Sequence, residues 1–126
     1  MTAPANTHVP AGISAGASPL VAPLFRPIQV RGLALANRVV MAPMTREFSP
    51  GGVPGDDVVA YYQRRAAAET GLIITEGVGI DHPAALGEAG LGEAKIPHLY
   101  GDEALAGWRR VVDAVHLVHH RGDGAL

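Results

Sequence analysis

A short apolar run that stops at a proline is the feature that most constrains how this chain can fold. Residues 39–41 are Val-Val-Met, a continuous apolar stretch of the kind found in parallel strands that are covered on both faces. Pro43 has no amide hydrogen for a strand ladder, so the strand expected over residues 38–41 ends before it. Thr45 and Arg46 then place a hydroxyl and a cation just beyond the strand's carboxyl end, where α/β folds hold their ligands.

A second apolar run, Leu-Ile-Ile-Thr at residues 72–75, predicts another buried strand. Between the two runs we expect a helix over residues 58–70, capped by Asp56 or Asp57 and closed by Gly71. Its apolar face comprises Val58, Val59, Tyr62 and Ala66. Strand, helix and strand in this order make a βαβ unit.

Two further elements flank this unit. Residues 29–31 and 33–35 surround Gly32 and predict a small hairpin before the first strand. After a long segment rich in glycine and proline, residues 77–101, Asp102 is expected to cap a last helix. An apolar stripe marks that helix: Leu105, Trp108, Val111, Val112 and Val115. The chain is therefore predicted to have an α/β fold in which a hairpin precedes two strand–helix units.

The ends of the two strands form the strongest candidate site. In a barrel of βα units, residues 42–45 (Ala-Pro-Met-Thr) and Gly77 lie side by side on one face. The first segment offers backbone groups, a thioether and a hydroxyl, and a glycine lets a large planar ligand approach the backbone closely. Both positions also have ordinary explanations, because Thr45 could begin a turn and Gly77 could serve backbone conformation alone.

Composition sets the outer limits. The 126 residues suffice for one domain, and 48% hydrophobic with 17% charged residues fits a buried-strand protein better than a disordered one. A net charge of −2 gives no reason to expect nucleic acid or an acidic membrane as a partner, and the lack of cysteine excludes disulfides and thiolate chemistry. Residues 1–23 lack the cationic start and apolar core of a secretion signal, and no run is long enough to span a membrane. A flexible leader and a cytoplasmic location are expected.

Several histidines and glutamates are of the residue types found in metal or acid–base sites. His116, His119 and His120 are spaced for one face of a helix, but no carboxylate set completes them, so no metal site is expected. The acidic residues of the long loop have no evident partner and are expected to be solvated: Glu76, Glu88 and Glu93. Two histidines flank the same loop and could approach a ligand: His82 and His98.

The strand-end motif and the motifs around it closely resemble the amino-terminal segment of the old yellow enzyme family, the FMN-dependent NADH:flavin oxidoreductases. The motifs follow one another at suitable separations over residues 24–116. They are LF at 24–25, NRVVMAPMTR at 37–46, Tyr61 with RA at 65–66, GLIITEG at 71–77, and Trp108 with VH at 115–116. Several motifs in order are far more specific than one short match.

The resemblance implies an FMN-dependent (β/α)8 barrel that reduces activated alkenes, such as α,β-unsaturated carbonyls, with NAD(P)H. The residues lying against the flavin would be Ala42, Pro43, Met44, Thr45 and Gly77. By the same resemblance, the Thr45 side chain would hydrogen-bond a flavin carbonyl, and Gly77 would line the pyrimidine side of the ring. Arg38 and Trp108 would serve packing and local ion pairing.

The resemblance stops near His116 and divides the chain into a leader at 1–23, two βα units of an incomplete barrel at 24–116, and a divergent tail at 117–126. The family's catalytic and phosphate-binding residues belong to later segments, so no residue here is assigned a catalytic role. We expect the amino-terminal part of such an oxidoreductase, inactive alone and with weak FMN binding. Two alternatives stay open: a non-enzymatic remnant or assembly partner that self-associates through exposed sheet edges, and an independent small α/β binding domain.

Overall fold

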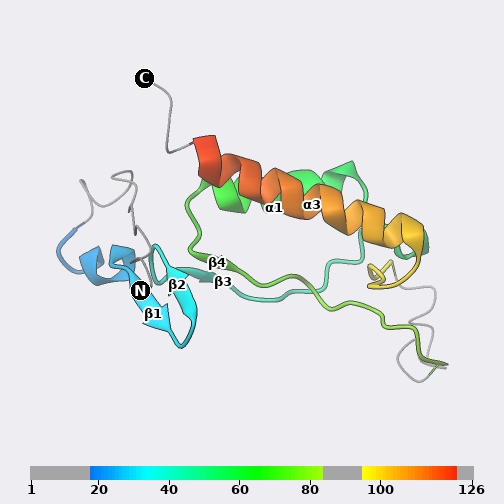
Figure 1. Cartoon of the computed structure of the whole chain (residues 1–126), viewed down its shortest axis with the longest axis horizontal. Helices are drawn as coiled ribbons and strands as arrows, with labels where there is room; N and C mark the ends of the chain where they lie inside the picture. The colour runs from blue at the N-terminus through cyan, green and yellow to red at the C-terminus, as the bar shows by residue number, and fades with distance from the viewer. Residues whose placement is uncertain (1–17, 84–94, 122–126) are drawn as a thin grey trace, which may run out of the picture.

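The computed structural model describes residues 18–83 and 95–121, and its elements alternate strand and helix after an initial hairpin (Figure 1). In chain order they are η2 (Ala22–Phe25), β1 (Ile28–Val30), β2 (Leu33–Leu35), β3 (Val40–Met41), η3 (Pro50–Gly52), α1 (Asp56–Ala67), β4 (Leu72–Ile73) and α3 (Asp102–Arg121). Among these residues no helix is both long and apolar enough to cross a membrane.

The predicted βαβ unit is confirmed. Strand β3 pairs in parallel with β4, with Val40 opposite Leu72 and Met41 opposite Ile73, and α1 forms the crossover between them. Both strands are shorter than predicted. The hydrogen bonding nevertheless extends one residue before β3, where the Val39 carbonyl accepts the Gly71 amide at 3.0 Å.

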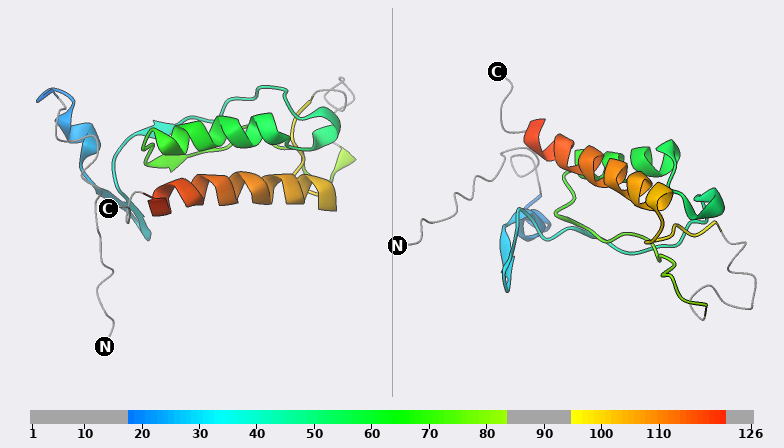
Figure 2. Two further views of the ribbon diagram at one scale, coloured as in Figure 1. Left: turned by 90° about the horizontal axis from the view of Figure 1, so that it is seen from above. Right: turned by 45° about the vertical axis from the view of Figure 1, so that its right-hand side comes forward.

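The prediction that the first strand is covered on both faces is wrong for the described residues. Val40 is 47% exposed, whereas Met41 packs against the helical core. The helices lie on one side of the two-stranded sheet, so the residue that points the other way stays open (Figure 2).

The core lies where α1 and α3 pack side by side above the strands (Figure 2). Its buried residues come from both helices, and Met41 and Ile73 add half-buried side chains from β3 and β4. The central cluster is Val58, Tyr62, Trp108 and Val111. Three of the four residues predicted for the apolar face of α1 are fully buried, and the fourth, Val59, is half-buried, so the period-3.6 prediction is confirmed.

The predicted caps of α1 are wrong at both ends. The N-cap is Gly55, and the two predicted aspartates lie in the first turn, where their charge favours the positive end of the helix dipole. At the other end Glu69, with φ 57, takes the left-handed conformation predicted for Gly71. Gly71 is needed for space instead, because a Cβ there would lie 2.7 Å from the Asn37 carbonyl oxygen.

Helix α3 turns a slightly different face inward than its stripe predicts. Ala104, Trp108 and Val111 are buried, whereas Leu105 is 45% exposed and Val112 is also exposed. A Cβ on Gly107 would lie 2.7 Å from the Pro54 carbonyl oxygen, so this glycine lets the helix approach the segment before α1 and sets its rotation. The predicted cap is also displaced by one residue, since the Gly101 carbonyl accepts the Leu105 amide at 3.0 Å and Asp102 lies in the first turn.

The predicted hairpin is confirmed at one end of the molecule (Figure 2). Strands β1 and β2 are antiparallel, with Ile28 opposite Leu35 and Val30 opposite Leu33. Arg31, with φ 52, provides the left-handed turn residue, so the neighbouring Gly32 is not the one under conformational demand. A hydrogen bond of 2.7 Å from the Arg38 amide to the Leu24 carbonyl links the segments on either side of the hairpin.

Candidate functional site

The structure brings Thr45 and Gly77 together just beyond the paired ends of β3 and β4. The Thr45 hydroxyl oxygen lies 3.1 Å from the position that a Cβ on Gly77 would take. Ala42, Pro43 and Met44 precede Thr45 along the same strand end and are exposed, Met44 to 60%. The five candidate residues therefore present an open surface of backbone, small groups and one hydroxyl.

The ordinary explanations for these two residues do not hold in this geometry. Gly51, Gly52 and Gly101 have positive φ angles, but Gly77 does not, so the backbone at residue 77 would accept a side chain. Residues 42–49 form no hydrogen-bonded turn, so Thr45 does not begin one. What Gly77 provides is room beside the Thr45 hydroxyl.

Beneath this surface lies a buried carboxylate, which corrects the expectation that Glu76 is solvated and unpaired. Glu76 is 3% exposed. One carboxylate oxygen accepts a hydrogen bond of 2.9 Å from the Arg46 guanidinium, and the other accepts one of 3.1 Å from the Arg46 backbone amide. The Tyr62 hydroxyl accepts the Glu76 amide at 2.9 Å and donates to its carboxylate at 3.4 Å. Both carboxylate oxygens and the backbone amide of Glu76 are therefore hydrogen-bonded.

Aromatic rings hold the Arg46 side chain. Its guanidinium lies 3.5 Å from the centroid of the Tyr61 ring, and that of Arg65 lies 3.4 Å from the same centroid. Two cations this close to one centroid must occupy opposite faces of the ring. Phe48 adds a more distant ring at 5.5 Å. Cation–π contacts are stronger when the cation is desolvated, and the Arg46 side chain is only 14% exposed.

Sequence reasoning identified Arg46 only as a cation after the strand and did not connect it with Glu76. The signal was nevertheless present, because an arginine follows the first strand end and a glutamate follows the second. Opposite charges at the ends of two neighbouring parallel strands are close in space even when, as here, 30 residues separate them.

Burial raises the pKa of the Tyr62 hydroxyl above its ordinary value of 10.0, and the neighbouring Glu76 charge acts in the same direction. The folded state therefore keeps the Tyr62 proton to a higher pH than the unfolded chain does. Stability from this proton is complete below about pH 10 and is lost as the pH rises through the folded-state pKa.

We expect Tyr62→Phe to respond differently at neutral and alkaline pH. At neutral pH the free energy of unfolding of the variant should be about 1–3 kcal/mol lower than that of the wild type, because the Glu76 amide loses its acceptor. Above about pH 10 its free energy of unfolding should fall less steeply than that of the wild type, because phenylalanine does not ionise. Urea denaturation over this pH range measures both effects, and equal slopes for the two proteins would contradict the prediction.

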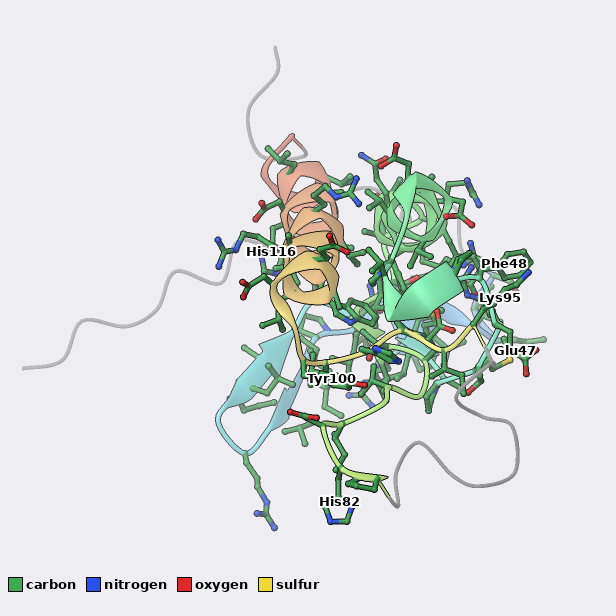
Figure 3. The ribbon with its side chains drawn as sticks, turned by 90° about the vertical axis from the view of Figure 1, so that its right-hand side faces the viewer. Glu47, Phe48, His82, Lys95, Tyr100 and His116 are labelled. Carbon is green, nitrogen blue, oxygen red and sulfur yellow. The ribbon has the colours of Figure 1, made fainter. Side chains whose placement is uncertain are left out.

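Among the other candidate histidines, His98 lies beside the segment that follows β4, because its backbone forms a parallel bridge with Gly79. The His98 ring stacks on Tyr100 with centroids 4.6 Å apart, and the His98 carbonyl accepts the Trp108 indole N–H at 3.0 Å. His82 and His116 lie apart from each other in Figure 3. Outside the described residues, or with side chains outside them, lie Glu88, Glu93, His119 and His120. Within residues 18–83 and 95–121, histidine, aspartate and glutamate side chains form no group of three that could hold a metal ion.

Comparison with known proteins identifies the family of this chain. The model of the NADH:flavin oxidoreductase / NADH oxidase family matches residues 23–119. The chain therefore belongs to this family of flavin oxidoreductases. The resemblance to old yellow enzymes that the sequence motifs indicated is thereby confirmed.

Individual relatives match the same region. A 12-oxophytodienoate reductase 7 from Oryza sativa subsp. japonica is 43% identical over 95 residues, which are 75% of this chain and 22% of the relative. The solved structure of morphinone reductase in complex with tetrahydroNAD is 42% identical, with a TM-score of 0.64, over 75% of this chain and 24% of that one. The old yellow enzyme from Trypanosoma cruzi is 35% identical, with a TM-score of 0.64, over 78% of this chain and 25% of its own.

These identities and TM-scores support the predicted α/β fold, and the coverages show how much of each relative this chain matches. The chain spans about a quarter of the length of the relatives it matches. Within the described residues the strands form two separate two-stranded sheets and no closed barrel.

Proposed function

We propose that this chain is the amino-terminal part of an FMN-dependent oxidoreductase that reduces activated alkenes with NAD(P)H. In this proposal β3, α1, β4 and α3 are the first two βα units of a (β/α)8 barrel. The observation that carries the proposal is the pairing of Thr45 with a glycine whose backbone conformation does not require glycine. Family membership supplies the cofactor and the class of reaction.

The residues at the strand ends suit one side of a flavin. A planar ring needs an accessible surface and close approach to the backbone, and the exposed segment 42–45 together with Gly77 provides both. In this proposal the Thr45 hydroxyl hydrogen-bonds the ring edge beside Gly77. When bound, FMN supplies hydride transfer from a reduced nicotinamide to the alkene.

No residue of this chain is proposed to be catalytic in the strict sense. In this proposal the described residues line one side of the ring only, so the chain alone binds FMN weakly and does not turn over substrate. Activated alkenes such as α,β-unsaturated carbonyls are the proposed substrates of the enzyme to which this part belongs.

A titration of the chain with FMN, followed by quenching of flavin fluorescence, tests this proposal. We expect weak but saturable binding, which Gly77→Val should reduce by about tenfold, equivalent to ~1.4 kcal/mol, because the side chain fills the space beside Thr45. Gly32→Val is the matched control, because a Cβ on Gly32 has nothing within 4 Å and lies in the hairpin turn. The absence of saturable binding, or equal affinity in Gly77→Val, would contradict the proposal.

A second candidate function is supported by the unpaired sheet edges. Within the described residues the β3–β4 sheet has two strands, so each strand leaves one edge free, and the exposed Val40 and Ile74 lie beside them. In this alternative the chain associates through these edges and does not use flavin. Association in gel filtration without any response to FMN would favour it.

A further inference from the structure

We propose that Glu76 is a positioning residue that fixes the spacing between Thr45 and Gly77. The assignment of those two residues as flavin contacts rests on the proposed function, but the coupling between them does not. The carboxylate of Glu76 acts from below the exposed surface and does not itself reach it, because its side chain is 1% exposed.

The order of residues along the chain makes this coupling direct. Arg46 follows Thr45 and Glu76 precedes Gly77, so any bond between Arg46 and Glu76 ties the two candidate contacts through single peptide units. Two such bonds exist, one from the Arg46 amide at 3.1 Å and one from its guanidinium at 2.9 Å. The amide bond matters most, because it fixes backbone next to Thr45 rather than the end of a flexible side chain.

The direct hydrogen bonds between the two strand ends, among the described residues, all end on the Glu76 carboxylate. The ladder between the two strands ends with the bond of 3.2 Å from the Ile74 amide to the Met41 carbonyl. Beyond it, within residues 18–83 and 95–121, the hydrogen bonds that join segments 42–49 and 75–79 directly are those of the Glu76 carboxylate. Both segments are also bonded to a third one, through the Ser49 amide to the Lys95 carbonyl at 2.8 Å and the Gly79 amide to the Pro97 carbonyl at 3.0 Å. Without that carboxylate the two strand ends would be connected only through residues 95–99, which bond to Ser49 and Gly79 and not to the residues next to Thr45 and Gly77.

The position of Glu76 is in turn fixed by the core. Tyr62 is 1% exposed on α1 and belongs to the central cluster, and its hydroxyl holds both the amide and the carboxylate of Glu76. Arg46 is held independently, because its guanidinium lies against the Tyr61 ring. Contacts with helix α1 therefore fix the spacing between Thr45 and Gly77.

Ion pairing alone does not explain this arrangement. A buried ion pair is weak evidence for stability, because desolvation of both charges offsets their attraction. What this carboxylate does beyond ion pairing is accept a backbone amide with its second oxygen. Glutamine cannot replace both oxygens, because its side chain ends in one acceptor oxygen and one donor NH2 group. If its oxygen accepts from the guanidinium, its NH2 group faces the Arg46 amide, which is also a donor.

Nuclear magnetic resonance of the isotopically labelled full chain tests the proposal without FMN. In the wild type the Arg46 amide should exchange with solvent at least about tenfold more slowly than the neighbouring Glu47 amide, because it is bound to a buried acceptor. A nuclear Overhauser contact should also join Thr45 and Gly77. In Glu76→Gln we expect the protection to fall by about tenfold and the contact to weaken or vanish. Far-UV circular dichroism confirms that the helices remain.

Glu47→Gln is the matched control, because it removes the same charge from an exposed residue of the same strand end (Figure 3). It should leave both signals unchanged. Protection and contact that persist in Glu76→Gln would overturn the proposal. Should Glu76→Gln not fold, the wild type alone decides, because equal exchange of the Arg46 and Glu47 amides would overturn it as well.

Titration with FMN separates this proposal from the proposed function. If both hold, Glu76→Gln should weaken FMN binding by about tenfold while Glu47→Gln binds as the wild type does. If the wild type does not bind FMN but Glu76→Gln loses the contact between Thr45 and Gly77, the positioning role stands and the flavin assignment fails. If Glu76→Gln keeps that contact, the positioning role fails whatever the wild type binds.

Discussion

Trp108→Ala is expected to unfold the pair of helices. Trp108 is 7% exposed and lies in the central cluster, with its ring 6.1 Å from that of Tyr62 between centroids. Its indole N–H also donates to the His98 carbonyl at 3.0 Å, which joins α3 to the segment before it. Truncation of a buried tryptophan costs about 3–5 kcal/mol, and small domains have only about 5–15 kcal/mol in total.

The core of the described residues is small, so the remaining contacts should not compensate for the stability lost in Trp108→Ala. Its fully buried apolar side chains come almost entirely from α1 and α3. We expect the helical circular dichroism of Trp108→Ala at 25 °C to fall toward that of an unfolded chain, with loss of a cooperative urea transition.

Leu105→Ala provides the control on the same helix. Leu105 belongs to the predicted apolar stripe but is 45% exposed, so its truncation should change the free energy of unfolding by less than about 1 kcal/mol. A Trp108→Ala variant that unfolds at the same urea concentration as the wild type would contradict the packing of α1 on α3. Equal destabilisation by both substitutions would contradict the rotation of α3.

This contrast also shows where the sequence was sufficient for the fold. The 3.6-residue period of α1 depends on its own residues, and its inner face was predicted correctly. The inner face of α3 depends on Gly107 lying against Pro54, a contact between residues far apart in the chain. A stripe that contains both Val111 and Val112 leaves the rotation open, and the contact of Gly107 with Pro54 together with packing on α1 selects between them.

The caps and the coverage of the strands could not be predicted for a similar reason. Asn37 donates to the Glu69 carbonyl at 2.7 Å and accepts the Val39 amide at 2.9 Å, so a residue before β3 organises the end of α1. Local rules instead assigned that end to Gly71. Val40 is exposed because helices cover only one side of the β3–β4 sheet in the described residues. An apolar run does not by itself specify whether one side or both sides of its strand are covered.

For the site, the strand ends and the opposite charges that follow them were predictable, and the burial of Glu76 against α1 was not. The order of the elements brings residues 45 and 77 to one edge, because the carboxyl ends of parallel strands coincide. Burial of Glu76 depends on Tyr62 reaching it from α1, and a glutamate beside glycines gives no sign of that. Buried polar groups without a local partner are the hardest residues to assign from a single sequence, because their partners are distant in it.

The second large effect is expected at Glu76 itself. Glu76→Leu leaves the Arg46 guanidinium, the Arg46 amide and the Tyr62 hydroxyl without their acceptor. Removal of one partner of a buried pair costs about 3–5 kcal/mol. Urea denaturation at neutral pH, with sulfate present to keep the variants folded, measures the loss.

The double variant Arg46→Met with Glu76→Leu tests whether Glu76 serves only as an ion pair for Arg46 or also as a backbone clamp. Here a backbone clamp means that the Glu76 carboxylate holds the Arg46 amide by a hydrogen bond. If the carboxylate served only the guanidinium, removal of both charges would restore or exceed wild-type stability, as it does for many buried pairs. We expect recovery of only part of the loss, because the amide of residue 46 and the Tyr62 hydroxyl still lack an acceptor, at about 1–3 kcal/mol for each. Full recovery would contradict the clamp.

The exposed pair formed by Arg110 and Asp56 calibrates this result. Their side chains are 52% and 91% exposed, so Asp56→Asn should cost less than about 1 kcal/mol despite the close contact. The two pairs have the same chemistry and differ in burial and in what else the carboxylate holds. A cost at Glu76 several times that at Asp56, with incomplete rescue by the double variant, would therefore measure the backbone clamp that sets Thr45 beside Gly77.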